Sequence, residues 1–266
     1  MTRVGSYELV ELIGEGATGA VHRALGADGT EVAVKLLRAE YANEAVVRAR
    51  FLREARITGE IGSLHVVQVF EAGDDGETAY LVMPLYRGGS LAGRLEAGPV
   101  ELCEALDLAA QLGKGLDVLH DRAILHRDVK PSNVLLDGTG LAALTDFGLA
   151  RAAGSTRLTR DGQLLGTVAY LAPELIEGDE ATRASDVYAL GCVLYECLAG
   201  LPPFVGATEA EVGFAHLVEP PPELPGPNAE LSFALLTALA KSPAERPTSG
   251  TALARMLHLA RSSGQR

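Results

Sequence analysis

The residues best suited to chemistry lie between His126 and Asn133, in the sequence HRDVKPSN. The proline would break a helix, and the charges do not suit a strand, so an ordered loop is expected. Asp128 could accept a proton or orient a hydroxyl, and Lys130 could neutralise a phosphate. Asn133 could offer an amide oxygen to a hard cation such as Mg²⁺. Such a loop indicates phosphate chemistry only if the other parts of a phosphate site occur elsewhere.

One such part is a glycine-rich stretch near the N-terminus. Gly14, Gly16 and Gly19 form a G-x-G-x-x-G pattern between two strand-like segments. Glycines let the backbone bend tightly and approach phosphate oxygens without a Cβ in the way. A strand follows the pattern instead of a helix, which argues against a Rossmann dinucleotide fold. A plain hairpin turn remains the alternative for this pattern alone.

A second part is a lysine at the end of an apolar strand. Lys35 follows Val32–Val34, and a lysine there is costly to bury unless it is paired. Glu54, in the middle of a predicted helix, is the candidate partner. The alternative is a lysine that reaches water and a solvated helical glutamate.

A third part is the sequence Thr145-Asp146-Phe147-Gly148, which follows an apolar run. It would place the Asp146 carboxylate at the end of a strand. Asp146 and Asn133 could together hold Mg²⁺, which prefers oxygen ligands and shares them with phosphates. A surface turn is the alternative for this motif by itself.

The elements that must position these residues change character near Pro84. Before it, the pattern is mainly that of strands, with one helix over residues 43–60. Within this part we expect strands over 7–12, 20–24, 31–37, 66–72 and 78–83, with turns at 26–29 and 73–76. After it, helices are predicted over 102–120, 185–200, 231–241 and 248–260. A cleft between two such pieces is a natural ligand site.

The composition excludes several classes of protein. The length of 266 residues suits one large domain or two lobes with a substantial core. A net charge of -12 argues against nucleic acid or an anionic membrane as the main partner. Three cysteines without a Cys-x-x-Cys pair favour a reducing cytoplasm over a disulfide framework or zinc site, and each is expected to be a small buried residue. The apolar run Val187–Leu201 is too short to span a bilayer and suits a buried helix, and no signal peptide is recognisable.

In their order along the chain, these motifs resemble those of eukaryotic-type (Hanks-type) serine/threonine protein kinases, most of all the bacterial members. The resemblance covers about residues 7–258 and includes Ala172-Pro173-Glu174. It implies an α+β fold of two lobes, with an antiparallel β-rich N-lobe over 1–84 that carries one main helix. A larger helical C-lobe would cover 85–260, with a tail over 261–266. The implied activity is transfer of the ATP γ-phosphate to Ser or Thr hydroxyls of proteins.

The resemblance also assigns the site. ATP, with Mg²⁺ or Mn²⁺, would lie between the lobes, with Asn133 and Asp146 as metal ligands. Asp128 would orient the substrate hydroxyl, Lys130 would stabilise the moving phosphoryl group, and Thr167 would help to select Ser/Thr substrates. Lys35, steered by Glu54, would hold the α- and β-phosphates. The implied ATP contacts are Ile13, Gly14, Glu15, Gly16, Ala17, Thr18, Gly19, Val21, Ala33, Lys35, Met83, Pro84, Tyr86, Leu135 and Asp146.

Residues 146–174 correspond, on the same resemblance, to an activation segment. We expect autophosphorylation at Thr159 first and at Thr156 or Ser155 second, with Arg127 and Arg151 as the basic groups that receive the phosphate. Three structural roles are also implied. Asp186 would bind the backbone of the 126–133 loop, Glu174 would pair with Arg246, and His126 would pack in the core.

Two other readings share parts of this pattern. A pseudokinase, acting as a binding or scaffold module, would be expected to lack Lys35, Asp128 or Asp146, and all three are present. A small-molecule phosphotransferase would lack Lys130 and the Ala172-Pro173-Glu174 segment.

One departure from the family bears on how the protein would be activated. Thr58 stands where the family usually has a larger apolar residue. This suggests an active state that depends on phosphorylation, homodimerisation or a partner. The expected partners are protein substrates, and the expected location is the cytoplasm. The chain could be a free-standing kinase or the cytoplasmic domain of a membrane-anchored one.

Overall fold

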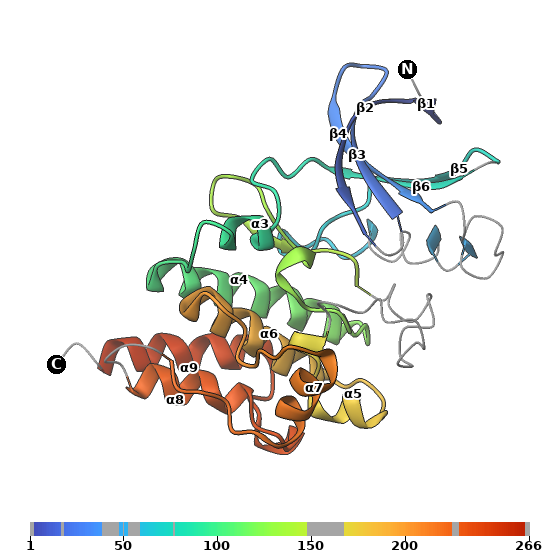
Figure 1. Ribbon diagram of the computed structural model, residues 1–266. Coiled ribbons are helices and arrows are strands. Elements are labelled where there is room, and N and C mark those ends of the chain that lie inside the picture. Colours follow the sequence, from blue (N-terminus) through green and yellow to red (C-terminus); the bar gives the residue numbers. More distant parts are fainter. Residues whose placement is uncertain are drawn as a thin grey trace.

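Alternating side chains and turn residues give the N-terminal part its antiparallel sheet. The computed structural model describes residues 3–16, 19–38, 48–49, 51–52, 59–76, 78–147, 168–224 and 229–263. Among these, six strands form one sheet in the order β1-β2-β3-β4-β6-β5, with every neighbouring pair antiparallel. They are β1 (Arg3–Val4), β2 (Tyr7–Glu15), β3 (Gly19–Leu25), β4 (Glu31–Leu37), β5 (Glu71–Asp74) and β6 (Ala79–Pro84). Figure 1 shows this sheet above the helical part of the molecule.

The hairpin turn predicted at residues 26–29 is confirmed. Gly26 N donates to Thr30 O at 2.9 Å, and Gly29 has a φ of +81°, which glycine adopts at little cost. The Asp28 carboxylate accepts from Thr30 N at 2.9 Å and so closes the turn. This local chemistry sets the register in which Val21 faces Lys35 across β3 and β4.

The strand predicted over residues 66–72 is wrong in its extent, because β5 begins only at Glu71. Val67 N donates to Leu144 O at 2.8 Å, whereas Phe70 N donates to Val82 O at 2.8 Å. The hydrogen bonds of this extended stretch are therefore divided between two neighbours, and no continuous ladder forms. The turn predicted at 73–76 is displaced for the same reason, and it follows Asp74.

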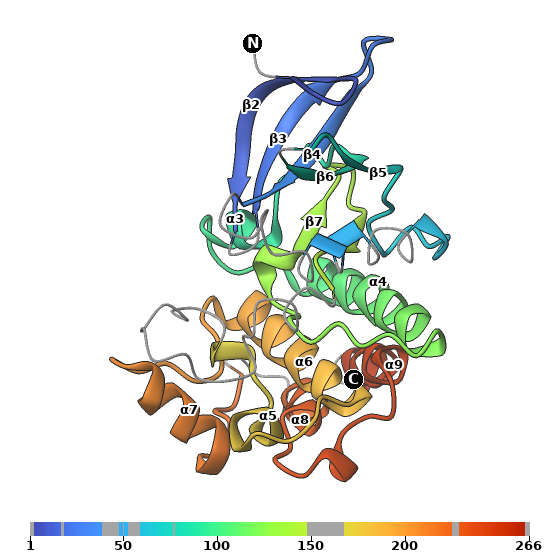
Figure 2. The ribbon, with the colours of Figure 1, turned by 90° about the vertical axis from the view of Figure 1, so that its right-hand side faces the viewer.

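Helices make up most of the second part, as predicted. They are α3 (Leu91–Leu95), α4 (Leu102–Asp121), α5 (Pro173–Glu177), α6 (Arg183–Ala199), α7 (Glu209–Val218), α8 (Ala229–Ala238) and α9 (Gly250–Ser263). Short 3-10 turns lie at η1 (Pro131–Asn133), η3 (Val168–Tyr170) and η4 (Pro243–Glu245), and a small hairpin is formed by β7 (Val134–Leu136) and β8 (Ala142–Leu144). Figure 2 shows β7 between the large sheet and α4. The two-lobed α+β fold is thus confirmed.

The long helices α4, α6, α8 and α9 match their predicted ranges within a few residues. Of the helix predicted over 43–60, the described residues 48–49, 51–52 and 59 are helical. Helices α3, α5 and α7 were not predicted. The first two are too short to repeat an apolar period, and α7 buries Gly213, Ala215 and His216 while Phe214 and Val218 are exposed.

Helix α6 is the most deeply buried element of the helical part. A capping box between Thr182 and Ser185 begins it, and Gly200, with a φ of +81°, ends it. Most of its side chains are buried, as the apolar run predicted. Cys192 and Cys197 are among them, but Cys103 is exposed on the same face of α4 as Asp107, so the burial predicted for Cys103 is wrong. Within the described ranges, no helix has the length and apolarity needed to cross a membrane.

A buried ion pair joins α5 to the turn before α9. Arg246 Nη1 and Nη2 lie 2.7 Å from Glu174 Oε1 and Oε2, and both residues are buried. Ser185 Oγ also donates to Glu174 Oε1, at 2.8 Å. Burial favours the neutral carboxyl, but the hydrogen bonds from Arg246 and Ser185 outweigh it and lower the pKa of Glu174. The predicted pair is confirmed.

We predict that Glu174→Gln lowers the free energy of unfolding at pH 7 by about 3 kcal/mol, because the Arg246 charge stays buried without its partner. The folded-state pKa of Glu174 lies below the ordinary carboxyl value of 4.5, so the unfolded chain binds more protons in that range. The contribution is therefore complete above pH 4.5 and is lost as the pH falls through the folded-state pKa. Urea unfolding of both proteins at pH 7 and pH 4 measures this. The exposed Glu180→Gln is the control, and an equal loss in both variants would contradict the prediction.

Candidate active site

The loop from His126 to Asn133 gathers its polar side chains around one carboxylate. Lys130 Nζ lies 2.9 Å from Asp128 Oδ2. Asn133 Nδ2 donates to the same Oδ2 at 2.9 Å and to Asp128 O at 2.8 Å. The amide nitrogen of Asn133 is thereby used, which leaves its Oδ1 as an acceptor. The structure therefore brings together the three residues that the sequence singled out in this loop.

Asp186, from the first turn of α6, holds the backbone of this loop. Its Oδ2 accepts from His126 N at 2.9 Å and its Oδ1 from Arg127 N at 2.8 Å. His120 Nε2, from the last turn of α4, donates to Oδ2 at 2.8 Å. Arg127 has a φ of +67°, an unfavourable value for a residue with a Cβ, so this carboxylate stabilises a strained turn. The role predicted for Asp186 is confirmed, whereas His120 was missed.

His126 has a structural place, as expected. Its side chain is fully buried, and its ring lies edge-on to Phe147 with centroids 6.1 Å apart. Asp128 N donates to His126 Nδ1 at 3.4 Å. Burial lowers the pKa of His126, against the opposing effect of the Asp186, Asp128 and Asp146 charges. The neutral imidazole therefore packs under the loop.

Asp146 lies beside this loop at the end of β8. Thr145 N donates to Asn133 O at 2.9 Å, which joins the two chain segments that carry the predicted metal ligands. Asp146 has a φ of +59°, a second strained residue within the site. A carboxylate and an amide oxygen from adjacent segments form a donor set that suits Mg²⁺, with phosphate oxygens completing its shell. The residues present therefore fit the expected metal.

Lys35 has a described partner that the sequence did not suggest. Its Nζ lies 2.6 Å from Asp146 Oδ1, and its side chain is only 4% exposed. The expected partner, Glu54, lies outside the described residues. The pair joins β4 of the sheet to the end of β8, across 111 positions of sequence.

The residues expected around adenine form one apolar cluster. Ala33 and Met83 are buried neighbours across β4 and β6 and belong to one apolar cluster. Val21, Tyr86 and Leu135 pack against this cluster. Pro84, at the end of β6, faces Val32. Leu135 comes from β7, so the cluster draws on both parts of the chain.

The glycine-rich loop is a tight hairpin at the end of β2. Gly16 N donates to Gly19 O at 2.8 Å. A Cβ at Gly19 would come within 2.1 Å of Leu36 O, so a side chain cannot be accommodated there. Ile13, Gly14 and Glu15 belong to β2, and Ile13 is exposed, as a residue open to a ligand would be. Ala17 and Thr18 lie outside the described residues.

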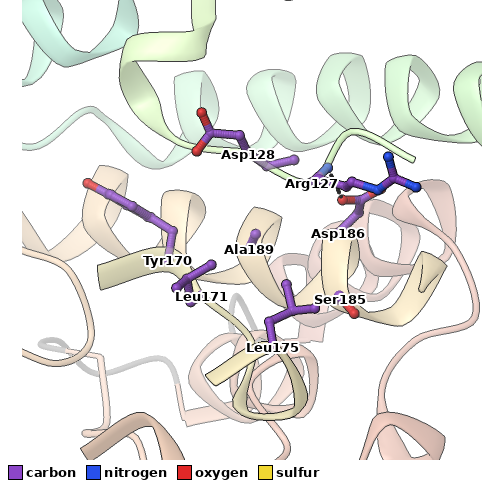
Figure 3. Close-up of a pocket in the computed structure, with 9 residues that line it drawn as sticks. Arg127, Asp128, Tyr170, Leu171, Leu175, Ser185, Asp186 and Ala189 are labelled. Carbon is purple, nitrogen blue, oxygen red and sulfur yellow. Dashed lines mark hydrogen bonds between the residues drawn. The ribbon is translucent and has the colours of Figure 1, made fainter. Parts of the chain in front are cut away.

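A pocket opens on the other side of Asp128, between the loop and the turn that precedes α5. Figure 3 shows Tyr170 and Leu171 of this turn on the side of the pocket opposite Asp128. Tyr170 Oη donates to Glu196 Oε2 on α6 at 2.6 Å, which fixes the turn. Burial raises the pKa of Tyr170, and the neighbouring Glu196 raises it further. The pocket is lined by Arg127, Asp128, Val129, Tyr170, Leu171, Leu175, Ser185, Asp186 and Ala189.

The sequence motifs do not assign Tyr170, Leu171 or Leu175 to the site. Their position just before and after Ala172-Pro173-Glu174 was the available signal. Several predicted residues lie outside the described part of the chain and are untested. They are Glu54, Thr58, Arg151, Ser155, Thr156, Thr159 and Thr167.

Comparison with known proteins places the chain among relatives of one kind. A family model described as the protein kinase domain matches residues 7–256. The DNA damage-responsive serine/threonine-protein kinase RqkA of Deinococcus radiodurans is 43% identical over 97% of this chain and 40% of its own length. The serine/threonine-protein kinase PknA of Mycobacterium tuberculosis is 39% identical over 94% of this chain and 60% of its own length. The chain thus spans about 40 to 60% of these relatives.

A solved structure has a similar fold. The crystal structure of the Mycobacterium tuberculosis PknI kinase domain, in its C20A mutant, superposes with a TM-score of 0.76 at 25% identity. The match covers 98% of this chain and 97% of that one. The similarity extends over both lobes.

We predict that Asp186→Asn loosens the 126–133 loop, because the new amide nitrogen faces a backbone N–H that needs an acceptor. Hydrogen exchange at His126 and Arg127 should accelerate roughly ten- to a hundredfold, the effect of losing one hydrogen bond to a charged group. Exchange followed by NMR measures this. Asp121→Asn, at the exposed end of α4, is the matched control, and unchanged exchange in Asp186→Asn would refute the anchoring role.

Proposed function

The chain belongs to the protein kinase family, and from that membership we propose that the protein transfers the γ-phosphate of ATP to serine and threonine hydroxyls of proteins. The observation that carries the proposal is the position of the Asp128 carboxylate, held by Lys130 and Asn133 beside a small pocket. Phosphoryl transfer depends mainly on positioning and on neutralising charge, and a strong base is not required.

The described residues of the loop and of the apolar cluster are proposed to divide the work of this reaction. Asp128 would orient the acceptor hydroxyl and take its proton late in the transfer. Lys130, already beside this carboxylate, would stabilise the moving phosphoryl group. Val21, Ala33 and Leu135 would enclose adenine, and the backbone from Gly14 to Gly19 would cover the phosphates. Met83 and the linker after it, with Pro84 and Tyr86, would line the inner edge of the nucleotide site.

The charged groups beside Asn133 would handle the phosphates. Lys35 would bind the α- and β-phosphates, with Asp146 and Asn133 as the metal ligands. When bound, Mg²⁺ or Mn²⁺ supplies neutralisation of phosphate charge. Lys35 and Asp146 are already paired at 2.6 Å, so the two groups that would face the phosphates lie together.

Regulation is proposed to act through residues outside the described ranges. Phosphorylation of Thr159, and then of Thr156 or Ser155, would place a phosphate near Arg127, whose backbone Asp186 holds. Thr167 would select Ser/Thr substrates, and a homodimer would allow phosphorylation in trans. All three cysteines are free, which agrees with a site of action in the cytoplasm, alone or as part of a membrane-anchored protein.

A transfer assay tests the function directly. The protein is incubated with radiolabelled ATP and either myelin basic protein or an aminoglycoside. Label on myelin basic protein alone is the expected result. Label on the aminoglycoside would support a small-molecule phosphotransferase, and no transfer to either acceptor would support a pseudokinase.

We predict that Asp128→Asn lowers kcat by about two to four orders of magnitude, because the proton acceptor is lost. ATP binding should stay within about twofold, since none of the proposed nucleotide contacts is removed. Nucleotide titration and the transfer assay measure the two effects separately. The exposed Asp107→Asn on α4 is the control, and near-normal turnover in Asp128→Asn would contradict the assignment.

We predict that protein incubated with ATP carries phosphate between residues 150 and 165, with Thr159 modified first. Mass spectrometry of digested protein over a time course measures the order. Asp128→Asn protein incubated alone should carry none, which separates autophosphorylation from contamination. An unmodified segment in active wild-type protein would refute the proposal.

A further inference from the structure

Lys241, just beyond α8, extends its side chain to the C-terminal end of α7. Its Nζ donates to His216 O at 2.6 Å and to Ala215 O at 3.1 Å. Ala215 O also accepts from Glu219 N, just after α7, at 3.0 Å. The last carbonyls of a helix generally lack partners within the helix, and the negative end of the helix dipole lies there. The Lys241 ammonium therefore binds α7 at the place where a cation is most favourable.

An aromatic cluster surrounds this contact. Lys241 Nζ lies 4.3 Å from the centre of the Phe204 ring, an arrangement that attracts a cation. The Phe204 ring lies edge-on to His216 with centroids 4.7 Å apart. His216 Nδ1 in turn lies 2.8 Å from Tyr188 Oη on α6. The end of α7 is thereby held to α6 as well as to Lys241.

The backbone that carries Lys241 is itself fixed. Arg246 Nε donates to Ala240 O at 2.8 Å, and Arg246 Nη2 donates to Lys241 O at 3.0 Å. Arg246 is the buried partner of Glu174 at the start of α5. Lys241 thus begins from an anchored position and points at α7.

Helix α7 leads from this contact to the pocket beside Asp128. A Cβ built on Gly213 of α7 would lie 3.7 Å from Val168 Cγ1 and 3.9 Å from Ile176, so the helix backbone packs closely on both. Val168 begins the turn that ends in Tyr170, and Tyr170 lines the pocket with Asp128. A displacement of α7 would therefore reach the pocket through η3.

The ammonium is kept at a cost to folding. Burial, followed by the charge of Arg246, lowers the pKa of Lys241 to about 8, although Cys192 on α6 and Glu219 after α7 favour the charged form. His216, the remaining titratable neighbour on α7, has a pKa lowered to about 4 by burial and by Lys241, so it is neutral at pH 7. From about pH 8 to 10.5 the unfolded chain binds more protons, so stability rises with pH. Because the Lys241 charge does not favour folding, its presence is better explained by the segment that the ammonium positions.

We propose that Lys241 is a positioning residue for the protein substrate. Its ammonium would hold α7, and through α7 the Val168–Tyr170 turn, at the side of the pocket opposite Asp128. This inference rests on the proposed kinase function. The apolar cluster around Ala33 and Met83 belongs to the other side of the site, so nucleotide binding should not depend on Lys241.

The test compares Lys241→Met, which keeps the apolar stem and removes the charge, with Lys241→Arg, which keeps the charge. For Lys241→Met, the KM for myelin basic protein should rise roughly two- to tenfold, the order of effect of a cation at a helix C-terminus. The KM for ATP should stay within about twofold of the wild-type value. The midpoint of thermal unfolding should stay close to that of the wild type. Lys241→Arg should restore the lower KM for the protein.

The pH profile adds a readout that a purely structural residue would not change. In the wild type, the KM for myelin basic protein should rise between pH 7 and pH 9, as Lys241 loses its proton. Lys241→Arg should show no such rise, because arginine stays charged, and Lys241→Met should be high throughout.

Three results would overturn the inference. They are an unchanged KM for the protein in Lys241→Met, an equal rise in the KM for ATP, and a large loss of thermal stability in both variants. Wild-type protein that does not label myelin basic protein at all would instead refute the proposed function. The two failures are therefore distinguishable.

Discussion

The buried Asp186 carboxylate is the interaction on which the described site depends. It accepts hydrogen bonds from two backbone amides of one loop and from His120 of α4. Those two amides belong to His126 and Arg127, and Arg127 is held at a positive φ. Such a conformation persists only where the surrounding structure stabilises it. This strained loop places Asp128 beside Lys130 and Asn133. One carboxylate at the start of α6 therefore determines where these three side chains lie.

Helix α6 distributes this kind of anchoring through the helical lobe. Ser185 binds the Glu174 carboxylate, Tyr188 contacts His216, and Glu196 accepts from Tyr170. Each contact ties a different segment around the pocket to the same buried helix. Because α6 is buried along most of its length, it is tightly packed, and these segments are held at fixed positions relative to one another. The position of Lys241 follows the same logic, since Arg246 links its backbone to Glu174.

Residues before and after Pro84 contact each other where the two lobes meet. From the β7–β8 hairpin, Ala143 belongs to the apolar cluster of Ala33 and Met83 in the large sheet, and Leu135 packs against it. Lys35 on β4 pairs with Asp146 at the end of β8. The β7–β8 hairpin therefore contributes to both the proposed nucleotide side and the proposed metal side of the site. Its place between the sheet and α4 explains how residues distant in sequence form one site (Figure 2).

The sequence by itself determined the features that depend on neighbours along the chain. The pattern of apolar residues predicted α4, α6, α8 and α9, and the stretch from Gly26 to Gly29 predicted a hairpin turn. The motif order also predicted Asp128, Lys130, Asn133, Lys35 and Asp146 as groups that could act on a phosphate, and this assignment stays a prediction. These signals are local, and helices or turns form largely from local spacing.

Only the tertiary structure decided which distant groups pair. Lys35 with Asp146, His120 with Asp186, and Lys241 with the end of α7 are choices among many charges of suitable type. The same holds for α7, which buries Gly213, Ala215 and His216 while its larger apolar side chains Phe214 and Val218 are exposed. A buried charge or polar group needs a partner, because burial makes an unpaired group costly. Which partner it has depends on the packing of the whole chain.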